Sequence, residues 1–137
     1  RAALRLMHFI EEDQRAQLQA EALEAQDFSR FLELVGQSGM SSCNLLQNCA
    51  TTSDTKHQGV LLALALTKMV CPGAVCRVHG GGFAGTIQAY IPTSELASFH
   101  TSIESVFGQN SVIELETGRP GISRLTATGW YFDEHGS

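Results

Sequence analysis

The chain has 137 residues, 43% hydrophobic and 17% charged, a composition typical of one globular domain rather than a disordered segment. Its net charge of −5 and its nine scattered Lys and Arg residues disfavour nucleic-acid binding, which needs clustered positive charge. No apolar run reaches the length that a transmembrane helix requires. We therefore expect a single domain over residues 1–137 that is cytoplasmic and binds neither membranes nor nucleic acids.

Residues 2–26 are rich in Ala, Leu, Glu and Gln and predict a long helix. Its apolar residues form two nearly opposite stripes: Leu4, Met7, Leu18, Ala22 and Ala25 on one, and Phe9, Ala16, Ala20 and Leu23 on the other. Such a helix is usually covered on two sides, either by its own core or by a partner domain. The acidic run 11–13 predicts a solvated face. Because the chain starts in helical sequence without Met, we expect it to belong to a longer protein.

Asp27 suits the N-cap of a second helix, in which Phe28, Phe31, Leu32 and Val35 follow helical spacing. Gly36 and Gly39 are plausible terminators of that helix. Residues 37–54 are polar and rich in turn formers, which predicts a long connection. Long connections often carry function, so its serines Ser38, Ser41 and Ser42 are candidates for a loop at a binding cleft.

The second half of the chain predicts a third helix over 55–70, capped by Ser53 or Asp54 and stopped by the run 71–73. Two strands follow over 74–79 and 86–91, and then a fourth helix capped by Thr93 or Ser94. Residues 112–116 predict a further strand. The tail from 122 to 137 is ambiguous; its Ile122, Leu125, Trp130 and Phe132 could cover a sheet edge. Helices and an antiparallel sheet segregated in this order indicate the α+β class.

The four cysteines, Cys43, Cys49, Cys71 and Cys76, fit neither a CxxC pair nor a zinc-binding pattern. Since nothing indicates export, we expect reduced thiols that pack as small apolar side chains. The histidines outside the glycine-rich run have no partner at a metal-ligand spacing such as H-E-x-x-H. We therefore expect no metal site.

The run 77–86, Arg-Val-His-Gly-Gly-Gly-Phe-Ala-Gly-Thr, places four glycines between two strands. A Rossmann loop needs a helix after its glycines, and a P-loop needs G-K-[ST], so neither fits. Two interpretations remain: a tight hairpin whose bare backbone packs on a neighbour, or a nest of N–H groups for an anion. Arg77 could neutralise a phosphate or pair with a carboxylate. His79 could be structural or catalytic.

Residues 73–86, Gly-Ala-Val-Cys-Arg-Val-His-Gly-Gly-Gly-Phe-Ala-Gly-Thr, resemble the third motif of the GHMP small-molecule kinases in its galactokinase form, roughly G-x-x-G-S-R-M-T-G-G-G-F-G-G-C. His8 and Arg15 lie in a stretch similar to the one that opens the galactokinase C-terminal domain. The segment 22–28 resembles the turn A-L-x-x-G-D-[LF] of that family, and 38–42 stands where the family has S-H-x-S-L. The resemblance covers about residues 4–120.

The sequence departs from the galactokinase pattern at several positions. Cys76 replaces Ser, His79 replaces Thr, Ala84 replaces Gly and Thr86 replaces Cys. Gly39 stands where many members have His, and the run 43–46 replaces R-D-D-Y. These departures resemble one bacterial branch of the family and leave the identity of the sugar open.

The resemblance implies a ferredoxin-like C-terminal domain with an antiparallel sheet and helices on one side. It implies a parent enzyme that uses ATP and Mg²⁺ to phosphorylate galactose at the 1-hydroxyl. The phosphate loop and the catalytic groups would lie in an N-terminal GHMP kinase domain of the same protein. We therefore expect no catalytic residue, no ATP or Mg²⁺ binding and no activity in this chain alone.

In this interpretation, the glycine-rich loop lines the cleft between the two domains and supports the phosphate loop. Its residues are Arg77, His79, Gly80, Gly81, Gly82, Phe83 and Gly85. Two alternatives stay open: a kinase for another small sugar or polyol, and a stand-alone ferredoxin-like module for ligand sensing or oligomerisation.

Overall fold

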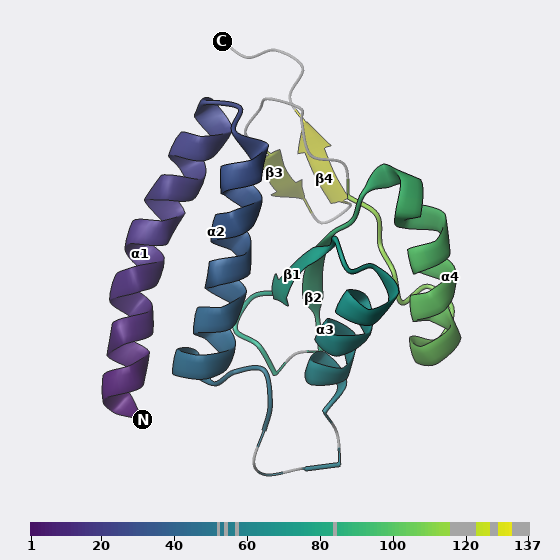
Figure 1. The fold of residues 1–137 in the computed structure, drawn as a ribbon, viewed down its shortest axis with the longest axis horizontal. Helices are drawn as coiled ribbons and strands as arrows, with labels where there is room; N and C mark the ends of the chain where they lie inside the picture. The colour runs from purple at the N-terminus through teal and green to yellow at the C-terminus, as the bar shows by residue number, and fades with distance from the viewer. Residues whose placement is uncertain are drawn as a thin grey trace.

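A computed structural model describes residues 1–51, 53, 55–56, 58–83 and 85–115 of the chain, together with the backbone of 123–126 and 129–132. Helices and two small antiparallel hairpins make up this part, which confirms the α+β class. Figure 1 shows two long helices side by side, with the sheet and the remaining helices next to them.

The first two helices form an antiparallel pair. Helix α1 spans Ala2–Glu24 and helix α2 spans Phe28–Ser41, close to the predicted starts. The Asp27 side chain accepts a hydrogen bond of 2.9 Å from the backbone N–H of Arg30, so the predicted N-cap is confirmed. Helix α2 contacts α1 along its length (Figure 1).

Helix α2 does not end at its glycines, and the connection predicted over 37–54 is wrong for 37–46, whereas 47–51 and 53 do lie in a connection. Gly36 and Gly39 lie inside α2, which passes directly into a π-helical turn, η1, over Ser42–Leu46. Gln47, with a φ of 59°, ends the turn. The two glycines serve packing instead of termination, because they lie against strand β1.

The sheet is a hairpin of strand β1, Val75–Val78, and strand β2, Ile87–Tyr90. The strands pair antiparallel, with Val75 opposite Tyr90 and Val78 opposite Ile87. This confirms the two predicted strands, each one residue shorter at either end. Helix α3 spans Gly59–Val70, so it begins four residues later than predicted. Ser53 is too far from this start to cap the helix, and Asp54 lies outside the described residues.

A short 3-10 turn, η2, over Thr93–Glu95 leads into helix α4, Leu96–Phe107. Neither Thr93 nor Ser94 caps α4, because both lie inside η2. The strand predicted over 112–116 is wrong for its described part: residues 112–115 join no sheet, although Val112 packs on the core. A second hairpin pairs strand β3, Ser123–Thr126, with strand β4, Gly129–Phe132. The apolar tail side chains predicted to cover a sheet edge lie outside the described residues.

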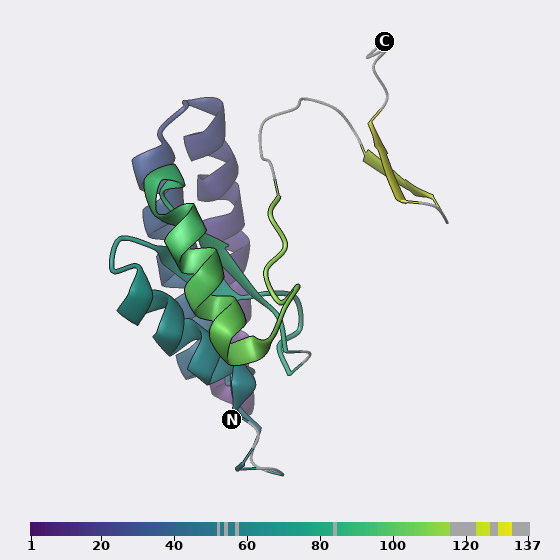
Figure 2. The same cartoon turned by 90° about the vertical axis from the view of Figure 1, so that its right-hand side faces the viewer.

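Helices cover both faces of the β1–β2 hairpin, not one face as predicted. On one face, α2 meets β1 at Val75 and Arg77, and Phe31 makes an edge-on ring contact with Tyr90 at 5.6 Å. Side chains alternate between the faces of a strand, so Cys76 and Val78 point to the other face, toward α3. Figure 2 shows α4 nearest the viewer and the pair α1–α2 behind.

The face toward α3 and α4 carries two clusters of buried side chains. One contains Cys71, Ala74, Phe99 and Ile103, packed with Leu66, Val70, Ala89, Ile91 and Val112. The other contains Cys49, Val60 and Val78, packed with Cys43, Leu64 and Ile87. The second cluster joins the segment after η1 to the end of β1, where the glycine-rich loop begins.

Candidate functional site

The glycine-rich run forms the turn that joins β1 to β2. The backbone N–H of His79 donates to the carbonyl of Thr86 at 3.0 Å and closes the hairpin. Gly80, Gly82 and Gly85 have φ values of 64°, 73° and 80°, in the left-handed region that side chains with a Cβ rarely adopt. The run is therefore a hairpin turn, as the first of the two interpretations from the sequence predicts.

One point of this loop is held firmly against the segment after η1. Gly82 is buried, and a Cβ there would be 2.3 Å from the carbonyl oxygen of Asn48. The same oxygen accepts a hydrogen bond of 3.2 Å from the backbone N–H of Phe83. By contrast, Gly80, Gly81 and Gly85 are exposed, and a Cβ at any of them would meet nothing within 4 Å. The loop therefore has one anchored residue and several open ones.

A surface depression of about 430 Å³ lies between the loop, the segment 49–51 and the start of α3. It is lined by Cys49, Ala50, Thr51, Gly59, Val60, Phe83 and Gly85. Gly59 and Val60 belong to the first turn of α3, whose N–H groups have no acceptor within the helix. Among the lining residues that the structure describes, none has an acidic, basic or histidine side chain. The described lining combines glycine backbone with mostly apolar side chains, and Thr51 adds a hydroxyl.

Arg77 pairs with a carboxylate rather than facing this depression. Its Nη1 lies 3.7 Å from Oε1 of Glu12 in α1, and its Nε donates to the carbonyl of Val78 at 3.3 Å. The structure thus favours the second of the two roles that the sequence left open for Arg77. His79 is exposed at the start of the loop. Of the predicted loop residues, Phe83 and Gly85 line the depression, whereas Arg77 and His79 do not.

Sequence reasoning missed Glu12, which is the centre of a polar network between α1, α2 and β1. Besides Arg77, its carboxylate accepts hydrogen bonds from Ser38 of α2 and from Arg15 one turn along α1. Glu12 was expected on a solvated face, but its side chain is only 26% exposed. The spacing of His8, Glu12 and Arg15 on one helical face is a pattern that could have indicated this network.

The three serines predicted to form a cleft loop are buried in helical structure. Ser38 and Ser41 lie in α2 and Ser42 begins η1, so the loop prediction is wrong. The hydroxyl of Ser41 and Nδ1 of His8 are 2.9 Å apart, a buried hydrogen bond between α1 and α2. Ser38 and Ser41 therefore both hydrogen-bond to side chains of α1 and link the two helices.

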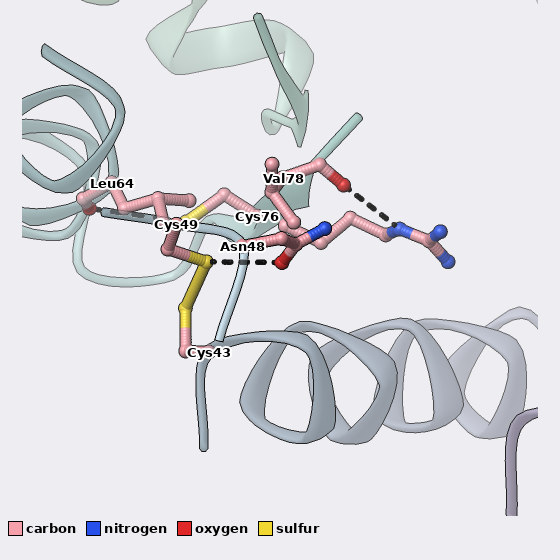
Figure 3. Close-up of a disulfide and its surroundings, with 7 residues drawn as sticks. Cys43, Asn48, Cys49, Leu64, Cys76 and Val78 are labelled. Atoms are coloured by element: carbon pink, nitrogen blue, oxygen red, sulfur yellow. Dashed lines mark hydrogen bonds between the residues drawn. A yellow bond between two sulfur atoms is a disulfide. The ribbon is translucent and has the colours of Figure 1, made fainter. Parts of the chain in front are cut away.

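The expectation of four reduced cysteines is also wrong. Cys43 in η1 and Cys49 just after it form a disulfide, with Cα atoms 5.3 Å apart (Figure 3). Their separation of six residues encloses the segment that ends in Asn48. Cys71 and Cys76 are free thiols. Burial raises the pKa of the Cys76 thiol, and the positive charge of Lys68 partly offsets this.

Within the described ranges, no group of three or more His, Cys, Asp or Glu side chains could hold a metal ion. No helix in the same part of the chain is long and apolar enough to cross a bilayer. The chain matches no family model, no curated protein and no solved structure.

Proposed function

We propose that this chain is the C-terminal domain of a galactokinase-like sugar kinase of the GHMP family. The observation that carries the proposal is the form of the loop at 79–86: a hairpin turn anchored at Gly82 and Phe83, with Gly80, Gly81 and Gly85 exposed. Such a surface allows a second loop to approach without an intervening side chain. This is the role that the family resemblance assigns to the third motif, as support for a phosphate loop.

The order of elements around the loop supports the finer fold assignment. In the ferredoxin-like pattern β-α-β-β-α-β, the four central elements are a helix, two strands and a second helix. The run α3, β1, β2 and α4 has this order, and α3 and α4 contact each other on one face of the hairpin. The described residues match only this central part of the pattern, because residues 112–115 after α4 form no strand and helix α2 covers the opposite face of the hairpin.

The outer face of α1 supports the proposed partner, an N-terminal GHMP kinase domain of the same protein. Leu6, Phe9 and Ile10 lie on neighbouring turns of α1, and Phe9 and Ile10 are 70% and 61% exposed. Adjacent large apolar side chains at the surface are typical of interaction sites. This exposed patch, which shares Phe9 with the second predicted apolar stripe of α1, would therefore be covered by the partner domain.

In this proposal, ATP and Mg²⁺ belong to the partner domain, because the described residues here offer no charged lining at the depression and no metal-binding group. Phosphoryl transfer depends on positioning the phosphates and stabilising their charge. This chain would contribute the loop at 79–86 to the cleft wall and would not phosphorylate galactose alone. Since sugar kinases draw on cytoplasmic ATP, we infer a cytoplasmic location.

The test is reconstitution in two parts. The chain is mixed with a separately produced N-terminal domain of a bacterial galactokinase, and association and ATP-dependent galactose phosphorylation are measured. We expect turnover from the mixture and none from the chain alone. The double variant Phe9→Ser/Ile10→Ser should lose association, whereas Met69→Ser, at an exposed residue of α3, should retain it.

Three outcomes would change the proposal. Turnover by the isolated chain would overturn its assignment as a dependent domain. Turnover of another small sugar or polyol, with galactose inert, would keep the kinase class and correct the substrate. Association without turnover of any sugar would favour the ligand-sensing or oligomerisation module instead.

A further inference from the structure

The disulfide Cys43–Cys49 encloses the residue that anchors the glycine-rich loop. Asn48 immediately precedes Cys49, and its backbone carbonyl is the acceptor for the Phe83 N–H. The same carbonyl is the closest contact for a Cβ at Gly82. A covalent link that fixes Cys49 therefore also restricts where the Asn48 carbonyl can lie.

We propose that Cys43 and Cys49 form a reversible redox site that controls the order of the glycine-rich loop. The oxidised pair holds Asn48 against Gly82 and Phe83. Reduction removes the link, lets the segment 47–50 move away from Gly82, and weakens the hydrogen bond to Phe83. This coupling acts on the loop whatever ligand or domain the loop receives.

The surroundings of Asn48 favour a change of this kind. Asn48 is buried, and its Nδ2 has no hydrogen-bond partner among the residues that the structure describes, so the oxidised arrangement leaves this polar group unsatisfied there. Its Oδ1 lies 3.8 Å from Sγ of Cys49 (dashed line in Figure 3). A disulfide sulfur carries no proton, so this contact lacks a donor. The reduced thiol of Cys49 would supply one and would draw the side chain into a new hydrogen bond.

The disulfide is also within reach of a reductant. Cys43 is half-buried, and both cysteines line a second surface depression, of about 650 Å³. Cys43 is therefore the expected point of attack, and accessible disulfides are the labile and regulatory ones. A dithiol attacks Sγ of Cys43, breaks the S–S bond and forms a mixed disulfide, releasing the Cys49 thiolate. Its second thiol then displaces Cys43, so two electrons and two protons pass to the protein and the reductant leaves as a cyclic disulfide.

The experiment compares hydrogen–deuterium exchange of the same chain before and after treatment with dithiothreitol. Mass spectrometry of alkylated peptides monitors the thiols, and we expect Cys43 and Cys49 to react only after reduction. We expect the peptide that spans 80–86 to exchange faster by about tenfold on reduction, the size expected for weakening one hydrogen bond. The peptide that spans α4 should not change, and reoxidation by a small disulfide should restore the slow exchange.

Two variants sharpen the comparison. Cys43→Ser should exchange rapidly at 80–86 with or without dithiothreitol, because it cannot form the link. Cys76→Ser keeps both cysteines of the pair and should retain the full response. If a variant does not fold, the comparison of the oxidised with the reduced wild-type chain still tests the proposal.

Three results would overturn the proposal. The first is alkylation of Cys43 and Cys49 without reductant, because the link would then be absent. The second is unchanged exchange at 80–86 although both thiols are released, which would make the disulfide a structural link only. The third is an equal increase in α4, which would mean general destabilisation rather than control of the loop.

Discussion

Gly82 lies so close to Asn48 that a Cβ at this position would be 2.3 Å from the Asn48 carbonyl oxygen and 2.7 Å from its Nδ2. The first distance is to backbone, which cannot rotate away as a side chain can. This contact joins two segments that are far apart in the sequence, the end of η1 and the turn of the hairpin. We therefore expect that Gly82 cannot be replaced without a shift of one of these segments.

The variant Gly82→Ala should therefore lose at least about 2 kcal/mol of unfolding free energy. The left-handed backbone costs a residue with a Cβ about 1–2 kcal/mol, and the contact with Asn48 adds to this. Urea unfolding followed by circular dichroism measures the loss. Gly81→Ala is the matched control, since Gly81 lacks a positive φ and has open space around it. Equal losses in the two variants would contradict the special role of Gly82.

Gly39 makes the corresponding contact on the opposite face of the hairpin. A Cβ there would be 3.0 Å from the carbonyl oxygen of Cys76 and 3.1 Å from Cβ of Arg77. Helix propensity alone predicts that Gly39→Ala stabilises α2 by about 1 kcal/mol. We expect the opposite sign, a loss of about 1–3 kcal/mol, because strand β1 would have to shift.

The control for Gly39 is Gly36→Ala, one turn earlier in α2. A Cβ at Gly36 would be 3.8 Å from Cγ1 of Val75, an ordinary contact. This variant should be neutral or more stable by up to about 1 kcal/mol. Urea unfolding of both variants in parallel gives the comparison. A stabilised Gly39→Ala would show that α2 and β1 are less closely packed than the structure indicates.

Gly36 and Gly39 also show which features of the fold the sequence predicts and which it does not. The glycine-rich turn was predicted because its neighbours alternate as strands do, a local pattern. Gly36 and Gly39 have the same local appearance as helix terminators, but close packing on β1 determines their role. That contact joins residues almost forty positions apart and leaves no local trace. Leu34 is buried for the same reason, because α2 lies between α1 and the hairpin.

The candidate site also has some parts that the sequence predicts and others that it does not. The loop at 79–86 follows from composition and spacing, as do the strands on either side. Its anchor at Asn48 could not be predicted, since residues 37–46 read as a polar connection instead of a continuous helix. The disulfide was missed because a spacing of six residues matches no common motif, and only the turn at Gln47 brings Cys43 and Cys49 together.

Glu12 offers a test of the network between the first two helices. Its carboxylate accepts from Ser38 and Arg15 and pairs with Arg77. Glu12→Gln keeps the size of the side chain but removes its charge, and leaves the buried Ser38 hydroxyl with a weaker acceptor. We expect a loss of about 1–3 kcal/mol in unfolding free energy, measured by urea unfolding. Asp13→Asn, at the exposed neighbouring position, should change it by less than about 0.5 kcal/mol. Equal changes in unfolding free energy in the two variants would mean that Glu12 is as solvated as Asp13 and contradict the network.

Because Cys71 and Cys76 are free thiols, we expect the unfolding free energy to fall at alkaline pH. Burial, opposed by Lys68, raises the pKa of Cys76, and a hydrogen bond to the Glu95 carboxylate, together with burial, raises the pKa of Cys71. In the unfolded chain, both thiols ionise from about pH 8.5, whereas in the folded chain they stay protonated to higher pH. Above about pH 8.5 the unfolded state therefore binds fewer protons than the folded state, so the unfolding free energy falls as the pH rises. Below that pH both states keep the two thiols protonated, and the thiols make no pH-dependent contribution.

Urea unfolding between about pH 7 and about pH 9.5 measures this slope, and the upper limit avoids ionisation of tyrosine. Burial raises the pKa of Tyr90, although Arg77 opposes the effect, so its own contribution would begin later. In Cys76→Ala the unfolding free energy should fall less steeply with pH, but it should still fall because the Cys71 thiol remains. An anaerobic buffer prevents new disulfides from forming with the ionised thiols. A slope in Cys76→Ala as steep as in the wild-type chain would show that Cys76 does not stay protonated in the folded state.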